Sequence, residues 1–261
     1  MSAQTYPTRP VTLVVGFAPG GGTDTVARVM QRKLAEYLGQ SVVVENRAGA
    51  GGTIAAAAVA KAEPDGYTIL LATIAALAVA PHLNSKLPYK PLADFAPLSM
   101  ATVSGNVLVV HPSVQAKSLG EYVKLANSQL GGLACGTSGV GSAGHLAGEL
   151  FRLTAKANLI HVPYKGGGPA MSDLLGGQIP SVFASATTAT PQVKSGKLRA
   201  LGSTGSKRSA SLPDVPTIAE QGYPGYEATN WYAYVAPAKT PRDLVTRLNR
   251  EIDRTQNEPG P

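Results

Sequence analysis

The chain has 261 residues, of which 44% are hydrophobic and 15% are charged, and this composition indicates a packed globular protein and argues against disorder. The formal net charge is +7, but the basic residues are scattered along the chain. No aromatic residues are interleaved with the densest basic patch at 194–208, so we expect no nucleic-acid partner. No apolar run approaches the roughly 20 residues that a membrane-spanning helix needs. The single cysteine, Cys135, cannot form an internal disulfide and is expected in the core.

The first hundred residues alternate between strand and helix. An apolar, β-branched run from Val11 to Phe17 predicts a buried strand, which a glycine-rich segment breaks. Thr23 and Asp24 are predicted N-caps of a helix that reaches Leu38. The further elements expected in this half are a strand at 41–45, a helix at 53–61 and a strand at 67–72. Such alternation is typical of a parallel sheet with flanking helices.

The same alternation begins again in the second half of the chain. The strands expected there cover residues 107–111, 133–136, 159–162, 179–183 and 198–203. The helices expected there cover residues 119–126, 145–153, 169–175 and 241–254. The two halves therefore repeat one architecture without a close sequence repeat.

Each half has one glycine-rich turn between a strand and a helix, at Phe17–Asp24 and at Thr137–Gly144. Glycine lets a ligand approach the backbone, and the first N–H groups of a helix have no internal partner and favour an anion. Taken alone, either segment fits an ordinary tight turn as well as it fits an anion-binding site. Two such turns, one in each half, favour a carboxylate site between two lobes.

Other kinds of site fit the sequence less well. Residues 139–144 match G-x-G-x-x-G, but the strand that precedes Tyr164 ends without the acidic residue of a dinucleotide site. The first turn lacks the G-K-[ST] ending of a phosphate-binding loop, and Ser138 is not in a G-x-S-x-G elbow. The four histidines are far apart in the sequence and lack metal-ligand spacing. We therefore expect no cofactor, no metal and no catalytic residues.

His145 allows two interpretations. It stands at a predicted helix N-terminus, where the helix dipole disfavours the charged imidazolium. A neutral imidazole there either donates to a ligand or anchors the turn, and we favour the anchoring role.

A series of motifs runs in order along almost the whole chain. They are Tyr6-Pro7-x-Arg9-Pro10, Phe17-Ala18-Pro19-Gly20-Gly21, Val44-Glu45-Asn46-Arg47, Pro64-Asp65-Gly66-Tyr67-Thr68, His145-Leu146-Ala147-Gly148-Glu149, His161-Val162-Pro163-Tyr164-Lys165-Gly166-Gly167, Asp173-Leu174-Leu175-Gly176-Gly177-Gln178 and Pro213-Asp214-Val215-Pro216-Thr217. This series resembles the Bug receptors, the periplasmic solute-binding proteins of tripartite tricarboxylate transporters.

The resemblance implies an α/β, two-lobed periplasmic-binding-protein type II fold (a Venus flytrap) with the ligand in the interlobe cleft. It implies lobe 1 at 1–101, lobe 2 at 102–228 and a return to lobe 1 at 229–261. Both glycine-rich turns would grip one carboxylate of a di- or tricarboxylate or an aromatic acid. Together, the turns and the resemblance predict ligand contacts at Phe17, Ala18, Gly20, Gly21, Thr23, Asp24, Thr73, Ser138, Gly141, Ser142, His145, Tyr164, Ala184 and Ser185.

The chain departs from the family pattern in two places. Ala184-Ser185 stand where many members carry an acid, which argues against amino-acid ligands because such an acid would pair with a ligand amino group. The chain also ends soon after the helix at 241–254, so the last part of lobe 1 is expected to be missing.

The expected function is therefore that of a non-enzymatic, monomeric receptor that delivers a small carboxylate to membrane subunits of a transporter. The chain begins Met1-Ser2-Ala3-Gln4 without a signal peptide, so we expect a periplasmic protein whose leader has been removed. One alternative is a carboxylate sensor that signals to a partner protein. Another is an α/β enzyme, which would need a nucleophile–base pair or a cofactor site.

Overall fold

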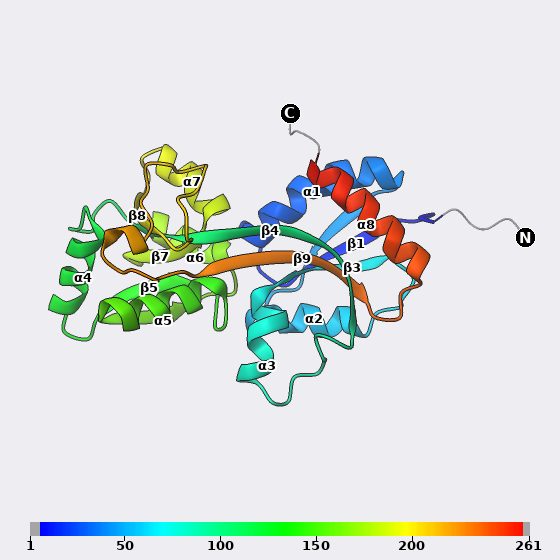
Figure 1. Ribbon diagram of the computed structural model, residues 1–261, viewed down its shortest axis with the longest axis horizontal. Coiled ribbons are helices and arrows are strands. Elements are labelled where there is room, and N and C mark those ends of the chain that lie inside the picture. The colour runs from blue at the N-terminus through cyan, green and yellow to red at the C-terminus, as the bar shows by residue number, and fades with distance from the viewer. Residues whose placement is uncertain (1–5, 258–261) are drawn as a thin grey trace, which may run out of the picture. The chain divides into compact units, whose positions relative to one another are not determined.

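The computed structural model describes residues 6–257, and its contacts divide the chain into two compact units. Within the described part, unit 1 comprises residues 6–17, 23–102 and 231–257, and unit 2 comprises residues 18–22 and 103–230. The chain passes from one unit to the other in the long strands β4 (Phe95–Val110) and β9 (Thr229–Pro237) (Figure 1). The expectations about a leader before Met1–Gln4 and about the chain end at 258–261 lie outside the described residues.

The sheet of unit 1 is built around β1 (Val11–Val15), whose side chains are buried on both faces. Such burial explains why this strand reads as a continuous apolar run. β2 (Val42–Asn46) and β3 (Thr68–Thr73) pair with it in parallel, and β9 pairs with β3 antiparallel. The carboxyl ends of β1 and β3 therefore lie at the same edge of the sheet.

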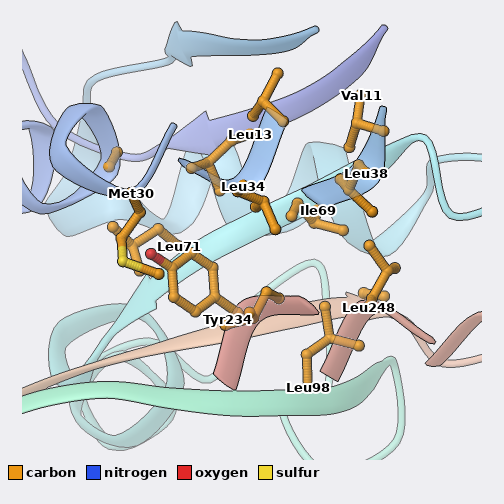
Figure 2. Packing of buried hydrophobic residues seen from close by; sticks show 14 of the residues in the cluster. Val11, Leu13, Met30, Leu34, Leu38, Ile69, Leu71, Leu98, Tyr234 and Leu248 are labelled. Atoms are coloured by element: carbon orange, nitrogen blue, oxygen red, sulfur yellow. The ribbon is translucent and has the colours of Figure 1, made fainter. Parts of the chain in front are cut away.

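Helices cover both faces of this sheet. One face carries α1 (Gly22–Leu38) and α8 (Arg242–Asn257), and the other carries α2 (Thr53–Ala60). Figure 2 shows Leu34 of α1, Leu71 of β3 and Leu248 of α8 packed in one cluster. Fully burying a side chain of this size contributes about 1.5–3 kcal/mol. The short elements of unit 1 are η1 (Ala50–Gly52), η2 (Ala75–Val79) and α3 (Ala80–Leu83).

The sheet of unit 2 has the order β4-β7-β5-β6, with β8 on the other side of β4. β5 pairs in parallel with β6 and β7, whereas β4 is antiparallel to β7 and β8. The carboxyl ends of β5 and β7 therefore share an edge with the residues at which β4 enters the unit. The bounds are β5 (Leu133–Thr137), β6 (Leu159–Pro163), β7 (Ser181–Ser185) and β8 (Arg199–Ser203).

Alternate residues of β4 belong to different clusters on the two faces of this sheet. Leu108 and Val110 pack with α4 (Leu119–Ser128) and α5 (Ala143–Ala155). Val107 and Val109 pack with α6 (Gly167–Leu175) and α7 (Ala186–Lys194). The short η3 (Ala219–Gln221) completes the unit, and Cys135 is buried in the α4–α5 cluster, which confirms its expected place in the core.

Several expectations about individual elements need correction. α1 begins at Gly22, so Thr23 and Asp24 lie in its first turn and are not its N-caps. β4 begins at Phe95, well before the predicted 107, because its first part is only partly buried and lacks a long apolar run. α7 was not expected, since it contains Pro191 and few apolar residues. No helix within residues 6–257 is long and apolar enough to cross a membrane.

Candidate functional site

The turn at Thr137–Gly144 joins β5 to α5 in unit 2. Gly139 and Gly141 adopt positive φ angles of 124° and 76°, which glycine accepts without a steric penalty. The hydroxyl of Thr137 accepts a hydrogen bond from the Gly139 N–H at 3.2 Å. Ser142 is the N-cap of α5, and its Oγ accepts the N–H of His145 at 3.2 Å. The turn is therefore held by its own side chains before any ligand binds.

The imidazole of His145 holds the same turn. Its Nδ1 accepts the N–H of Gly141 at 3.1 Å, and its ring stacks on His161 with 4.0 Å between the centroids. Nε2 of His161 lies 2.6 Å from the hydroxyl of Thr137. Burial lowers the pKa of both imidazoles, and for His161 the neighbouring His145 lowers it further. These bonds support the anchoring role for His145; a direct contact with ligand remains a prediction.

The two histidines are sixteen positions apart in the sequence, a spacing that predicted no shared site. Pairing of β5 with β6 brings His161 beneath α5, since Cys135 and His161 are opposite each other in the ladder. Cys135, Glu149 and both histidines line one small cavity. Within residues 6–257, however, no group of three His, Cys, Asp or Glu side chains is placed to hold a metal ion.

The first turn of α5 offers hydrogen-bond donors that the protein itself does not use. The first N–H groups of a helix have no acceptor within the helix. Ser142 takes the N–H of His145, which leaves those of Ala143 and Gly144 without an acceptor among the described residues. The positive end of the helix dipole lies at the same place, so this turn favours an anion.

Residues 18–22 of the first glycine-rich turn pack in unit 2, against the segment after β6. The N–H of Ala18 donates to the carbonyl of Lys165 at 3.0 Å. A methyl group on Gly168 would lie 2.1 Å from the carbonyl oxygen of Pro19, so only glycine allows this approach.

Gly167 brings parts of the two glycine-rich turns together. A methyl group at this position would lie 3.4 Å from the Cα of Gly21 and 3.4 Å from the Oγ of Ser138. Gly20, next to Gly21, has a φ of 79°. Within unit 2, the structure therefore gathers Ala18, Gly20, Gly21, Ser138, Gly141, Ser142 and His145 around one strand edge.

In unit 1, Asp24 fastens α1 to β2. Its Oδ1 accepts from Nδ2 of Asn46 at 2.9 Å, and its Oδ2 accepts from Nε of Arg28 at 2.9 Å. The same Asn46 amide donates to the carbonyl of Phe17 at 3.0 Å. Phe17, Thr23 and Asp24 are all buried. These bonds give Asp24 a structural role, and its predicted contact with ligand stays a prediction.

Thr73 ends β3 at the edge of the sheet where the turn after β1 begins. Its side chain is buried, with 5% of its surface exposed, and its Oγ1 has no hydrogen-bond partner within residues 6–257. Leaving a buried hydroxyl unsatisfied costs about 1–3 kcal/mol. The hydroxyl is therefore a candidate to bond with a group that the protein does not supply.

Three predicted residues have other roles in the structure. The hydroxyl of Tyr164 donates to Oδ2 of Asp173 at 2.7 Å. Burial is the main cause that raises the pKa of Tyr164 to about 12, and the neighbouring Asp173 raises it further. Ala184 is buried in the α6–α7 cluster, on the face of the sheet opposite α5. The Oγ of Ser185 lies 2.9 Å from the hydroxyl of Thr188 in α7. Ligand contacts of these three residues stay predictions.

Unit 2 also has a cavity of about 330 Å³ beside the loop after β8. It contains the basic residues Lys207 and Arg208, and Arg208 is paired with Glu220 at 2.9 Å. Its lining residues are Val103, Ser104, Gly105, Ala186, Ser203, Gly205, Ser206, Lys207, Arg208, Ser209, Ala210 and Thr229. None of the fourteen predicted ligand residues is among them.

Sequence reasoning missed one polar residue, Asn106, at the edge of unit 2 where α5 begins. Its side chain is 3% exposed, and its Nδ2 has no hydrogen-bond partner in the described part of the chain. The available signal was a single amide directly before the apolar run from Val107 to Val110.

Known proteins resemble this chain over most of its length. A family model described as "Tripartite tricarboxylate transporter family receptor" matches residues 26–260. Protein BugT of Bordetella pertussis is 44% identical over 254 residues, which are 97% of this chain and 78% of BugT. The structure of MatC from Rhodopseudomonas palustris with bound malate has a TM-score of 0.91 and 36% identity, covering 97% of this chain and 86% of MatC. The structure of R. palustris Rpa4515 with adipate has a TM-score of 0.91 and 38% identity, and the match covers 95% of this chain and 83% of Rpa4515.

The two structural matches confirm the expected α/β fold of the periplasmic-binding-protein type II class. The family model and BugT confirm the resemblance drawn from the motifs. The chain belongs to the tripartite tricarboxylate transporter receptor family.

Proposed function

We propose that this chain is a periplasmic solute-binding protein that captures a small dicarboxylate for a tripartite tricarboxylate transporter. The observation that carries the proposal is the first turn of α5, where the N–H groups of Ala143 and Gly144 have no acceptor among the described residues. The hydroxyls of Ser138 and Ser142 lie on the same turn, and Gly21 lies close to Ser138 across Gly167. This set contains hydrogen-bond donors and no acidic side chain, as a carboxylate requires.

Binding at this turn would rest on charge-assisted hydrogen bonds. Each bond to a charged group contributes about 1.5–3 kcal/mol. The turn is already held by Ser142 and His145, so little ordering is needed when a carboxylate arrives. Under this proposal the protein binds its ligand without converting it, acts as a monomer and passes the ligand to membrane subunits of the transporter.

Two observations favour dicarboxylates over amino acids. Two related structures contain malate and adipate, both of which are dicarboxylates. The side chain of Ala184 lies in an apolar cluster, so this position supplies no carboxylate to neutralise a ligand ammonium group. Malate should therefore bind better than aspartate, which differs from it by an ammonium group in place of a hydroxyl.

A thermal-shift screen tests the proposal with malate, adipate, citrate and benzoate, and with aspartate as the matched control for malate. At a ligand concentration about a hundredfold above Kd, binding stabilises the folded state by roughly 2.7 kcal/mol. The proposal predicts a rise in Tm with at least one dicarboxylate. If no carboxylate raises Tm while a nucleotide or an ester does, the receptor proposal fails.

Two N-cap variants separate binding from folding. Ser142→Ala removes the cap of α5, and Ser118→Ala removes the equivalent cap of α4, whose Oγ accepts the N–H of Glu121 at 3.2 Å. Each substitution should cost about 1 kcal/mol of stability. Only Ser142→Ala should also weaken dicarboxylate binding, as measured by calorimetry. Equal affinities in the two variants would exclude the Ser142 hydroxyl from the site and leave only the backbone N–H groups of α5 as donors.

A further inference from the structure

Asn106 has a donor that nothing in the described chain accepts. Its side chain is 97% buried, and Nδ2 has no hydrogen-bond partner among residues 6–257. Buried amides are almost always satisfied, because an unpaired donor loses its bonds to water and gains none. Such a group is a candidate to bond with a molecule that binds from outside.

The backbone around Asn106 is held in place by its neighbours on both sides. The Asn106 N–H donates to Oγ1 of Thr204 at 2.7 Å, and its carbonyl accepts the N–H of Thr204 at 2.9 Å. On the other side, Asn106 stands opposite Ser185 in the antiparallel ladder of β4 and β7. β7 and the segment after β8 therefore fix the position of its backbone.

Strand alternation places the carboxamide on the α5 face of the sheet. Leu108, two residues along β4, packs in the cluster of α4 and α5, whereas the neighbouring Val107 packs against α6 and α7. Side chains two residues apart on a strand share a face. Asn106 therefore points to the same side as Leu108.

The first turn of α5 lies over this part of the sheet. A methyl group on Gly144 would lie 2.6 Å from the carbonyl oxygen of Phe183, and Phe183 is opposite Leu108 in the ladder. Asn106 precedes Leu108 on β4 by two residues, about 6.6 Å. That step leads to the edge where β5 and β7 end and α5 begins. The Nδ2 donor and the unpaired N–H groups of α5 thus share one small region.

We propose that Asn106 is a ligand-binding residue, whose Nδ2 donates a hydrogen bond to the carboxylate held at the first turn of α5. The inference rests on the proposed function and adds a side-chain donor to its backbone donors. A carboxylate in place of this carboxamide would face the ligand carboxylate with a like charge and no donor.

Isothermal titration with malate and adipate tests the inference on wild type, Asn106→Asp, Asn106→Ala and Asn158→Asp. Asn158 lies beside the start of β6, at the opposite edge of the sheet, and its substitution changes the net charge equally. Losing a bond to a charged group should weaken binding roughly 10- to 150-fold in Asn106→Ala. Asn106→Asp should bind more weakly still, and Asn158→Asp should bind as wild type does.

A second measurement covers the case in which an Asn106 variant does not fold. In wild-type protein labelled with ¹⁵N-asparagine, the side-chain NH₂ signals of Asn106 should shift when dicarboxylate is added, while those of Asn158 should not. Wild type that binds no carboxylate would overturn the proposed function. Wild type that binds, with unchanged affinity in folded Asn106 variants or an unshifted Asn106 amide, would overturn only the role of Asn106.

Discussion

Replacing Thr73 with valine should stabilise the folded protein and at the same time lower its affinity for the ligand. The hydroxyl of Thr73 is buried and without a partner in the described chain, and valine keeps the β-branched shape that suits β3. Most substitutions at a binding residue lower stability or leave it unchanged. Opposite signs for stability and affinity would therefore identify a polar group that is held ready for a ligand.

The magnitudes follow from the state of that hydroxyl. An unsatisfied buried hydroxyl costs about 1–3 kcal/mol, and Thr73→Val removes this cost from the unliganded protein. For a chain of this length, each kcal/mol raises Tm by about 2–4 °C. If the hydroxyl donates to a ligand carboxylate, losing that bond should weaken binding by roughly 10- to 150-fold.

Differential scanning calorimetry gives Tm, and titration with the dicarboxylate that binds most tightly gives Kd. Thr240→Val is the matched control, because Oγ1 of Thr240 is also buried and without a partner within residues 6–257. Thr240 follows β9, which runs antiparallel to β3, so it lies at the other edge of the sheet of unit 1. Both variants should gain stability, and only Thr73→Val should lose affinity.

Two results would contradict this reasoning. A lower Tm for Thr73→Val would mean that the hydroxyl already has a partner in the unliganded protein. A higher Tm with unchanged affinity would mean that the hydroxyl is unsatisfied for a reason unrelated to the ligand, and Thr73 would then leave the list of predicted contacts.

Three further predictions concern unit 2. Gly168→Ala should lower the free energy of unfolding by about 1–3 kcal/mol and weaken dicarboxylate binding, because its methyl group would lie 2.1 Å from a backbone carbonyl oxygen. The control Gly120→Ala has open space around its methyl group, so thermal melts should show unchanged or higher stability and titrations unchanged affinity. Burial lowers the pKa of His145 and His161, so the unfolded chain binds more protons than the folded protein as the pH falls through 6.5, and Tm should drop between pH 7.5 and pH 5. An equally steep drop in a variant with both histidines replaced by asparagine would contradict this explanation. Burial raises the pKa of Cys135 to about 11, so the folded protein should not react with a thiol reagent at pH 8, and labelling as fast as in urea would refute this.

Sequence patterns predicted the positions of most elements, because the apolar periodicity of a strand or helix records which face it buries. They failed where periodicity is weak. The first part of β4 is only partly buried, and α7 contains Pro191 and several threonines, so neither has a clear apolar pattern.

Side-chain roles at the candidate site were predicted less well than its location. The glycine-rich turn and the cap residue Ser142 could be read locally, because capping and positive φ depend on neighbours in the chain. The stacking of His145 on His161 could not, since it depends on which strands pair. The partners of Asp24 likewise come from a strand more than twenty residues away.

By itself, the sequence determined the α/β class, the two glycine-rich turns and the family, because each depends on local composition or on motifs in order. Only the tertiary structure decided which donors remain unpaired. Whether Nδ2 of Asn106, Oγ1 of Thr73 or the N–H of Gly144 has an acceptor depends on every chain segment packed around it. Hydrogen bonding is short-ranged and directional, so the candidate contacts for a carboxylate became visible only after the strands and helices were placed.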